Sequence, residues 1–235
     1  ITKSLRFRAS GSTYMSRTPA GAGNRRTFKF VTGLKLGSIS ARQVLISAYG
    51  GGAGHEFEYD STTNQFLFQA NDAGAAVSIK ATPLYRDPTA HMYVELEVDT
   101  TQATAADRVK IKVNGAYCAL TITTSPALNA DLQINNNVLH NIGRRAADSV
   151  FYLDGYLSRT CLVDGSTSGV FGYLNTEINE WVTLSRSACK AVVDAGGTNS
   201  FMLEFEDGTS LTTLGNDYST KNNDWTLTNH SLTAG

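Results

Sequence analysis

Residues 92–98 read Met-Tyr-Val-Glu-Leu-Glu-Val, and residues 108–113 read Arg-Val-Lys-Ile-Lys-Val. In both runs apolar side chains alternate with charged ones, a period of two that is typical of a β-strand with one apolar face. A loop rich in Thr and Ala, residues 99–107, separates them. Asn114-Gly115 then predicts a tight turn into a further strand. These signals indicate antiparallel strands that follow one another as hairpins.

The same periodicity extends outward over most of the chain. Asp60 to Asn64 is a turn cluster, so residues 55–69 are predicted to form a hairpin. Residues 187–194 have helical spacing, and residues 175–182 are a weaker candidate for a second short helix. The pattern predicts an all-β, antiparallel β-sandwich with at most one or two short helices. Further strands are expected at residues 28–31, 43–46, 76–80, 116–122, 149–153, 156–163, 200–206 and 224–228.

Composition limits the functional classes. The chain has 235 residues, of which 41% are hydrophobic, so residues 1–235 can form one sandwich domain, alone or within a longer chain. The net charge of −1 gives no basic surface for nucleic acid. No apolar run is long enough to insert into a membrane. The three cysteines, an odd number without close spacing, indicate neither a disulfide framework nor a zinc site and favour a reducing compartment.

Acidic residues form the clearest catalytic pattern. Alternation places Glu56, Glu58 and Asp60 on one face of a strand, with carboxylates roughly 6.5–7 Å apart. Glycosidases use carboxylate pairs at about this separation. However, the same alternation recurs at Glu95 and Glu97, and again near residue 204. The repetition favours a solvated sheet face over a polysaccharide hydrolase, which remains the alternative interpretation.

A loop near the end of the chain is rich in oxygen ligands. Its candidates for Ca²⁺ are Asp217, Asn222 and Asp224, beside Asn216 and Asn223, because calcium prefers carboxylate and amide oxygens. The competing interpretation is that Asn and Asp only form turns there. The four histidines lie in separate segments without the spacing of transition-metal ligands.

Aromatic residues in loop-like stretches are the candidates for a glycan-binding face. A sugar site combines aromatic side chains with nearby hydrogen-bonding groups. The candidate residues are Tyr49, Tyr85, Tyr173, Trp181 and Tyr218.

A family resemblance rests on the order of several short motifs. Residues 4–18 read as two strands around a Gly turn, and residues 214–232 lead from a polar loop into a last strand at Trp225 and Leu227. Between them lie the 94–115 hairpin and Phe-Tyr-Leu-Asp-Gly-Tyr-Leu at residues 151–157. This order resembles the concanavalin A-like (laminin-G-like) jelly-roll domains of bacteriophage tail-fibre and virion appendage proteins. Residues 158–163 depart from the acidic and aromatic pattern of many relatives, so no ligand site is transferred to them.

The resemblance implies neighbouring first and last strands and a binding scaffold that is not an enzyme. It implies a virion protein, assembled in the host cytoplasm, that attaches to host-surface polysaccharide through a lectin-like sandwich. The alternative is a capsid decoration or head-fibre protein whose partners are the capsid shell, other virion proteins and its own copies. Exposed sheet edges favour a homo-oligomer.

Overall fold

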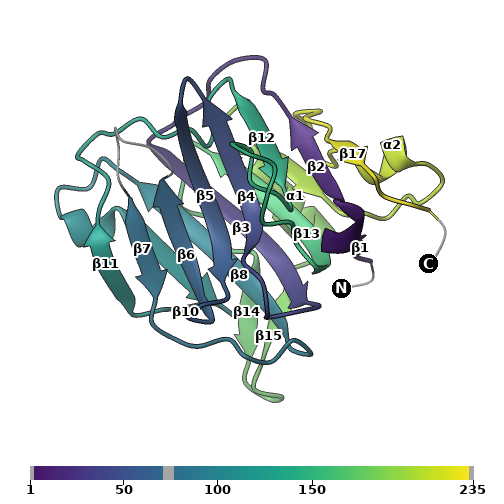
Figure 1. Cartoon of the computed structure of the whole chain (residues 1–235), viewed down its shortest axis with the longest axis horizontal. Helices are drawn as coiled ribbons and strands as arrows, with labels where there is room; N and C mark the ends of the chain where they lie inside the picture. Colours follow the sequence, from purple (N-terminus) through teal and green to yellow (C-terminus); the bar gives the residue numbers. More distant parts are fainter. Residues whose placement is uncertain (1–2, 71–76, 233–235) are drawn as a thin grey trace.

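A computed structural model describes residues 3–70 and 77–232 and shows two antiparallel sheets packed face to face (Figure 1). Among these residues the first sheet has seven strands in the order β1-β13-β3-β8-β9-β10, and β16 also pairs with β13. Its strands are β1 Leu5–Phe7, β3 Thr27–Leu36, β8 His91–Asp99, β9 Val109–Val113, β10 Ala116–Tyr117, β13 Gly155–Asp164 and β16 Phe201–Leu203.

The second sheet has, in the same described part, eight strands in the order β11-β7-β6-β5-β4-β12-β2-β17. Its strands are β2 Tyr14–Arg17, β4 Gln43–Gly50, β5 Ala53–Asp60, β6 Gln65–Ala70, β7 Ser78–Ala81, β11 Leu120–Thr124, β12 Leu139–Ile142 and β17 Thr226–Thr228. A separate hairpin consists of β14 Gly172–Asn175 and β15 Glu180–Thr183. The helices are α1 Arg186–Asp194, α2 Leu211–Leu214 and the 3₁₀ turns η1 Ala9–Gly11 and η2 Ala105–Asp107.

The main core lies between the two sheets and follows from the alternation. Phe28, Phe30 and Leu34 of β3 point inward and are fully buried, as are Phe57 and Tyr59 of β5. The rings of Phe30 and Phe57 meet edge to face across the sheets, 6.5 Å apart. The fold class predicted from the sequence is therefore confirmed.

A second, smaller core covers the outer face of the first sheet. Val31, Tyr93 and Cys161 from its central strands pack against Cys189 and Val193 of α1. The Ser185 hydroxyl caps this helix by accepting a hydrogen bond from the Ala188 N–H. The central strands of this sheet are consequently buried on both faces, and their outer face is not exposed to solvent.

Several predicted elements occur where expected. The 55–69 hairpin is β5 and β6, joined in register from His55↔Ala70 to Asp60↔Gln65. The 92–98 and 108–113 strands are β8 and β9, and the 187–194 helix is α1. Neither α1 nor any other helix of residues 3–70 and 77–232 is long and apolar enough to cross a membrane.

Other predictions were wrong for local reasons. Residues 116–122 are not one strand, because β10 pairs with β9 in the first sheet and β11 pairs with β7 in the second. Residues 149–153 form no strand, since Ser149 and Phe151 adopt positive φ angles of 59° and 55°. Residues 175–182 form the tip and return strand of the β14–β15 hairpin instead of a helix.

The remaining differences concern strand limits and pairing. The strand predicted at 200–206 is shorter, β16, and β12 was not anticipated. Of the strand predicted at 76–80, Ala76 lies outside the described residues. The last strand, β17, pairs with β2 and not with β1, which lies in the other sheet. Even so, β1 and β17 lie at the same side of the sandwich, as the edge strands of the two sheets (Figure 1).

Candidate functional site

The five predicted aromatic residues do not form one surface. Tyr85 packs on the main core, its ring 4.7 Å from that of Phe66, and burial raises the pKa of its hydroxyl above the usual value. Tyr49 is half-buried in β4, opposite Leu139. Trp181 and Tyr218 both pack against the second core, whereas Tyr173, on the hairpin of Trp181, is 51% exposed. The structure thus brings Trp181 and Tyr218 to one cluster and places Tyr49 and Tyr85 elsewhere.

The predicted calcium loop is organised by its own hydrogen bonds. Both oxygens of the buried Asp217 carboxylate accept hydrogen bonds, from the N–H groups of Met202, Ser219 and Asn223 and from the Ser219 hydroxyl. Asp224 accepts a hydrogen bond from the Asp217 N–H at 2.8 Å. The exposed Asn222 side chain faces Thr220 instead. These contacts fit the turn interpretation, because donors already occupy both oxygens of Asp217 and one oxygen of Asp224, and calcium binding stays a prediction.

The acidic row on β5 is buried rather than solvated. The Glu56 and Glu58 side chains are 0% exposed. Arg145 binds both oxygens of Glu56, at 2.8 and 2.9 Å, and Arg42 binds both oxygens of Glu58. Burial is the main influence on Glu58 and raises its pKa to about 8, against the hydrogen bond from Arg42. A sugar cannot touch carboxylates that are enclosed in this way, so the row offers no hydrolase site.

The row on β8 is covered by another segment. Lys29, only 2% exposed, lies 2.9 Å from Glu97 and donates a hydrogen bond to the Gly169 carbonyl. Lys112 also binds Glu97, at 2.7 Å. Burial alone would raise the pKa of Glu97, but the hydrogen bonds from Lys112 and Lys29 outweigh it and hold the pKa below its usual value. The prediction of a solvated sheet face was therefore wrong for both rows.

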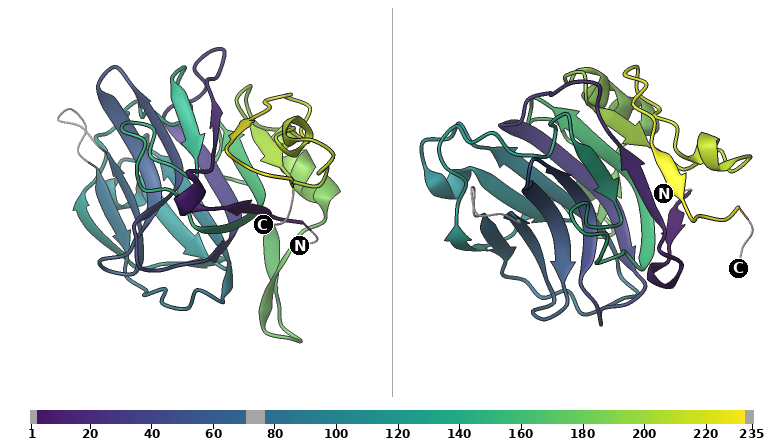
Figure 2. Two further views of the ribbon diagram at one scale, coloured as in Figure 1. Left: turned by 45° about the vertical axis from the view of Figure 1, so that its right-hand side comes forward. Right: turned by 45° about the horizontal axis from the view of Figure 1, so that its top comes forward.

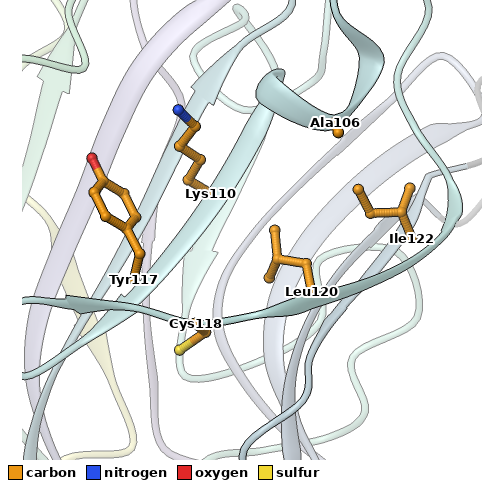
Figure 3. Close-up of a pocket in the computed structure, with 6 residues that line it drawn as sticks. All are labelled: Ala106, Lys110, Tyr117, Cys118, Leu120 and Ile122. Atoms are coloured by element: carbon orange, nitrogen blue, oxygen red, sulfur yellow. The ribbon is translucent and has the colours of Figure 1, made fainter.

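Surface hollows instead occur at the two open sides of the sandwich. At one side the chain crosses from the edge strand β10 to the edge strand β11. This crossing lines a hollow of about 350 Å³, here named the edge groove (Figure 3). Its lining residues are Ala106, Lys110, Tyr117, Cys118, Leu120 and Ile122. Tyr117 is 60% exposed, and the remaining surface is mainly apolar, with few groups that could hydrogen-bond a sugar.

At the opposite side the edge strands are β1 and β17, and a hollow of about 470 Å³ lies beside them. It is here named the terminal cleft. Its lining residues are Ser4, Leu5, Arg6, Arg8, Gly11, Thr13, Tyr156, Gly208, Leu214, Asn229, His230, Ser231 and Leu232. Hydroxyl, amide, guanidinium, imidazole and phenol groups all occur among them, the mixture that polar small-molecule sites use.

Local structure explains how this cleft is built. In β1, Leu5 and Phe7 enter the core, so Arg6 between them faces outward. Arg6 lies directly opposite Tyr156 of β13, and its guanidinium carbon is 5.6 Å from the Tyr156 ring centroid. After β1, η1 turns the chain back into β2, and Thr13 fixes this turn by accepting a hydrogen bond from the Arg8 N–H.

The chain after β17 forms the other wall. Asn229, at a φ of 59°, donates a side-chain hydrogen bond to the Ser12 carbonyl at 3.2 Å. The His230 ring meets the edge of Phe7 with centroids 5.0 Å apart. Burial lowers the pKa of His230 to about 4, so this imidazole is neutral at pH 7. The positive groups of the cleft are therefore its arginines.

Sequence reasoning did not select Arg6, Tyr156, Asn229 or His230 as site residues. The only signal in the sequence was the expectation that the two ends of the chain lie together. That expectation did not specify which strands pair, so it could not show which side chains meet. Within the described part, no group of three or more His, Cys, Asp or Glu side chains is arranged to hold a metal ion.

Comparisons with known proteins bear on the fold. No protein-family model and no curated protein matches the sequence. A putative carbohydrate binding protein from Bacteroides ovatus is similar over 97% of this chain and 58% of its own, with a TM-score of 0.57 and 13% identity. A heptameric SAP-like pentraxin from Limulus polyphemus is similar over 97% and 92%, with a TM-score of 0.54 and 10% identity. Together with the two packed antiparallel sheets, these likenesses show that the chain has the concanavalin A-like jelly-roll fold.

Proposed function

We propose that this protein is a non-enzymatic virion protein that binds host-surface polysaccharide through the terminal cleft. The observation that carries the proposal is the cleft itself, a hollow of about 470 Å³ with a half-buried tyrosine and convergent polar groups. The shared fold with a protein described as carbohydrate-binding agrees with a sugar as ligand. The enclosed Glu56 and Glu58 carboxylates support binding without hydrolysis.

The virion location rests on the sequence resemblance to phage appendage domains. Three unpaired cysteines agree with assembly in a reducing cytoplasm before release. Jelly-roll scaffolds serve many functions, so the location needs its own test. Immunogold labelling of purified particles would detect the protein on the virion surface, and its absence from particles would exclude this location.

Glycan binding is tested with the labelled protein on an array of bacterial surface polysaccharides. We expect saturable binding, and we expect Tyr156→Ala to weaken it at least about fivefold, since loss of an aromatic contact costs about 1 kcal/mol or more. Tyr117→Ala in the edge groove is the matched control and should bind as wild type does. Thermal melting confirms that both variants are folded.

Two results would contradict this function. One is the absence of binding to every polysaccharide on the array and to bacterial cells, whether or not their sugars are oxidised by periodate. The other is loss of binding in Tyr117→Ala with full binding in Tyr156→Ala, which would move the site to the edge groove.

A second candidate function, assembly with its own copies, is favoured by the β14–β15 hairpin. This hairpin projects from the body of the molecule (Figure 2). Around it Val170, Tyr173, Leu174 and Ile178 are 60%, 51%, 52% and 57% exposed. Each of its two strands pairs only with the other among the described residues, so both outer edges can accept another strand.

We infer that the exposed surface of this hairpin binds the same hairpin in a second copy of the protein. A twofold, antiparallel contact would bring the tip of one hairpin, with Glu177 and Glu180, to the base of the other. Near that base α1 presents Arg186 and Lys190, whose side chains are 40% and 35% exposed. Both cations already pair with carboxylates of this chain, Arg186 with Glu206 and Lys190 with Asp194. The contact would therefore be stabilised mainly by strand pairing and by the four apolar side chains, which would leave water.

Sedimentation velocity tests this contact. The wild-type protein should sediment as an oligomer, and the double variant Leu174→Glu, Ile178→Glu should sediment as a monomer with an unchanged melting temperature. A wild-type monomer at high concentration, or an oligomer that survives the double substitution, would contradict it.

A further inference from the structure

The pairing of Arg6 with Tyr156 presents a guanidinium in a defined orientation. The register of β1 on β13 sets the two side chains opposite each other on one face, and Leu5 and Phe7 hold the strand in the core. A guanidinium that lies over an aromatic ring uses its planar face, so its N–H groups remain available around the rim. Such a fork matches the two oxygens of a carboxylate or a phosphate.

Arg6 carries a charge that no carboxylate of the described residues neutralises. Five other arginines, at positions 26, 42, 145, 159 and 186, have a carboxylate partner. Arg6 has none among residues 3–70 and 77–232, and no Asp or Glu lines the terminal cleft. Arg8 lines the same hollow. Because Arg6 has no carboxylate beside it among the described lining residues, the cleft favours an anionic ligand, although the net charge of the chain is −1.

The uncharged groups of the cleft suit the rest of a sugar. Tyr156 offers a ring edge and a hydroxyl, and the exposed Asn229 lies on the opposite wall. Hydroxyl and amide groups can each donate and accept, which is what sugar hydroxyls require. The cleft therefore combines one anion-binding element with several neutral hydrogen-bonding groups.

We propose that the terminal cleft binds an acidic saccharide whose carboxylate or phosphate oxygens are held by the Arg6 guanidinium against Tyr156. This inference rests on the proposed glycan-binding function and specifies its ligand class. Arg8 adds positive charge, and the neutral groups contact the sugar hydroxyls. Binding by arginine also makes the interaction sensitive to salt.

The test starts from whichever polysaccharides the wild-type protein binds on the array. Each is measured again after chemical reduction of its carboxylates to alcohols, or after removal of its phosphates. We expect about tenfold or greater loss of affinity when the anion is removed, since a hydrogen-bonded charge pair contributes more than 1.4 kcal/mol. The two treatments distinguish a carboxylate from a phosphate.

Variants of the protein provide the second arm. On the untreated glycan, Arg6→Gln should bind more weakly than wild type by about the factor that anion removal causes. On the treated glycan, Arg6→Gln and wild type should bind equally. Arg6→Lys should recover only part of the loss, because an ammonium keeps the charge but not the fork. Arg86→Gln is the matched control: Arg86 is exposed, and its loss changes the net charge equally. All variants are checked by thermal melting.

The outcomes separate this inference from the proposed function. One outcome is that wild type binds treated or neutral glycans fully, that Tyr156→Ala loses this binding and that Arg6→Gln keeps it. This outcome would overturn the acidic ligand and leave the proposed glycan binding in place. Equal losses in Arg6→Gln and Arg86→Gln would also overturn it, as an effect of net charge alone. No binding to any glycan would remove both proposals.

Discussion

The two open sides of the sandwich are built from different kinds of chain segment. At the edge groove one continuous stretch, residues 116–124, runs from the first sheet to the second and fills the gap with Cys118 and Leu120. At the terminal cleft two segments from opposite ends of the chain, β1 and residues 229–232 after β17, line the same hollow. The continuous crossing leaves a mainly apolar hollow, whereas the junction of separate segments leaves a larger polar one.

This difference indicates that an open side of the sandwich can be mainly apolar or polar according to how the chain bridges it. The crossing packs only Cys118 and Leu120 against the core, and its other side chains, such as Tyr117, stay at the surface. The two separate segments are anchored by Leu5 and Phe7 in β1 and by Leu227 in β17, and side chains between these anchors, such as Arg6, can face solvent. Substitutions on the two sides test how far this distinction holds.

The largest expected effect concerns the floor of the terminal cleft. Phe7→Ala should lower the free energy of unfolding by about 3–5 kcal/mol, because Phe7 is fully buried between core residues and His230. Tyr117→Ala, at the other side, should cost about 1 kcal/mol or less, since its ring is 60% exposed. Urea denaturation gives both values. Equal losses would mean that the two sides are anchored alike.

A smaller effect concerns pH. The pKa of His230 is about 4 in the folded protein and is near 6.5 in an unfolded chain. Between these values the unfolded chain binds the extra proton, so this histidine makes stability fall as pH drops from 6.5 toward 4. We expect a loss of about 2 kcal/mol between pH 7 and pH 5 that is absent in His230→Asn.

Denaturation at several pH values measures that difference directly. His140 of β12, whose pKa burial also lowers to about 4, keeps its contribution in both proteins and therefore cancels. Parallel stability curves for wild type and His230→Asn would show that the imidazole is not sequestered beside the terminal cleft.

The smallest expected effect is at the edge groove. Tyr117→Phe removes a hydroxyl that donates to Glu97 at 3.2 Å, while Lys112 and Lys29 still bind that carboxylate. The free energy of unfolding should change by about 0.5 kcal/mol. A loss of about 2 kcal/mol or more would show that the edge groove depends on this polar contact. It would contradict the view that the edge groove is mainly apolar and the terminal cleft polar.

The sequence was informative where pairing is local. The β5–β6 and β8–β9 hairpins and α1 depend on short-range alternation, a turn and a cap, all of which are visible in the residues. The exposed Ile178 together with Trp181 and Val182 has helix-like spacing, which explains the wrong helix at 175–182. Leu139 to Ile142 of β12 contains His and Asn at its centre, so its alternation was too weak to detect.

The candidate site could not be predicted in the same way. Alternation does not reveal which outer sheet face another segment covers: Lys29 reaches the carbonyl of Gly169, 140 positions away. Buried charge pairs such as Arg145 with Glu56 look in sequence like ordinary surface residues. Arg6 and Tyr156 become neighbours only through the register of β1 on β13, and that register follows from core packing of Leu5 and Phe7.

The bond between Asn229 and Ser12 joins positions 217 residues apart, which has a consequence for biosynthesis. On the ribosome the hairpins at the edge-groove side can form while later segments are still being translated, but β2 keeps an open edge until residues 226–228 emerge. A nascent or prematurely terminated chain would therefore expose that edge and lack one wall of the cleft. Only chains that have been translated beyond β17 would then be able to bind a ligand in the cleft.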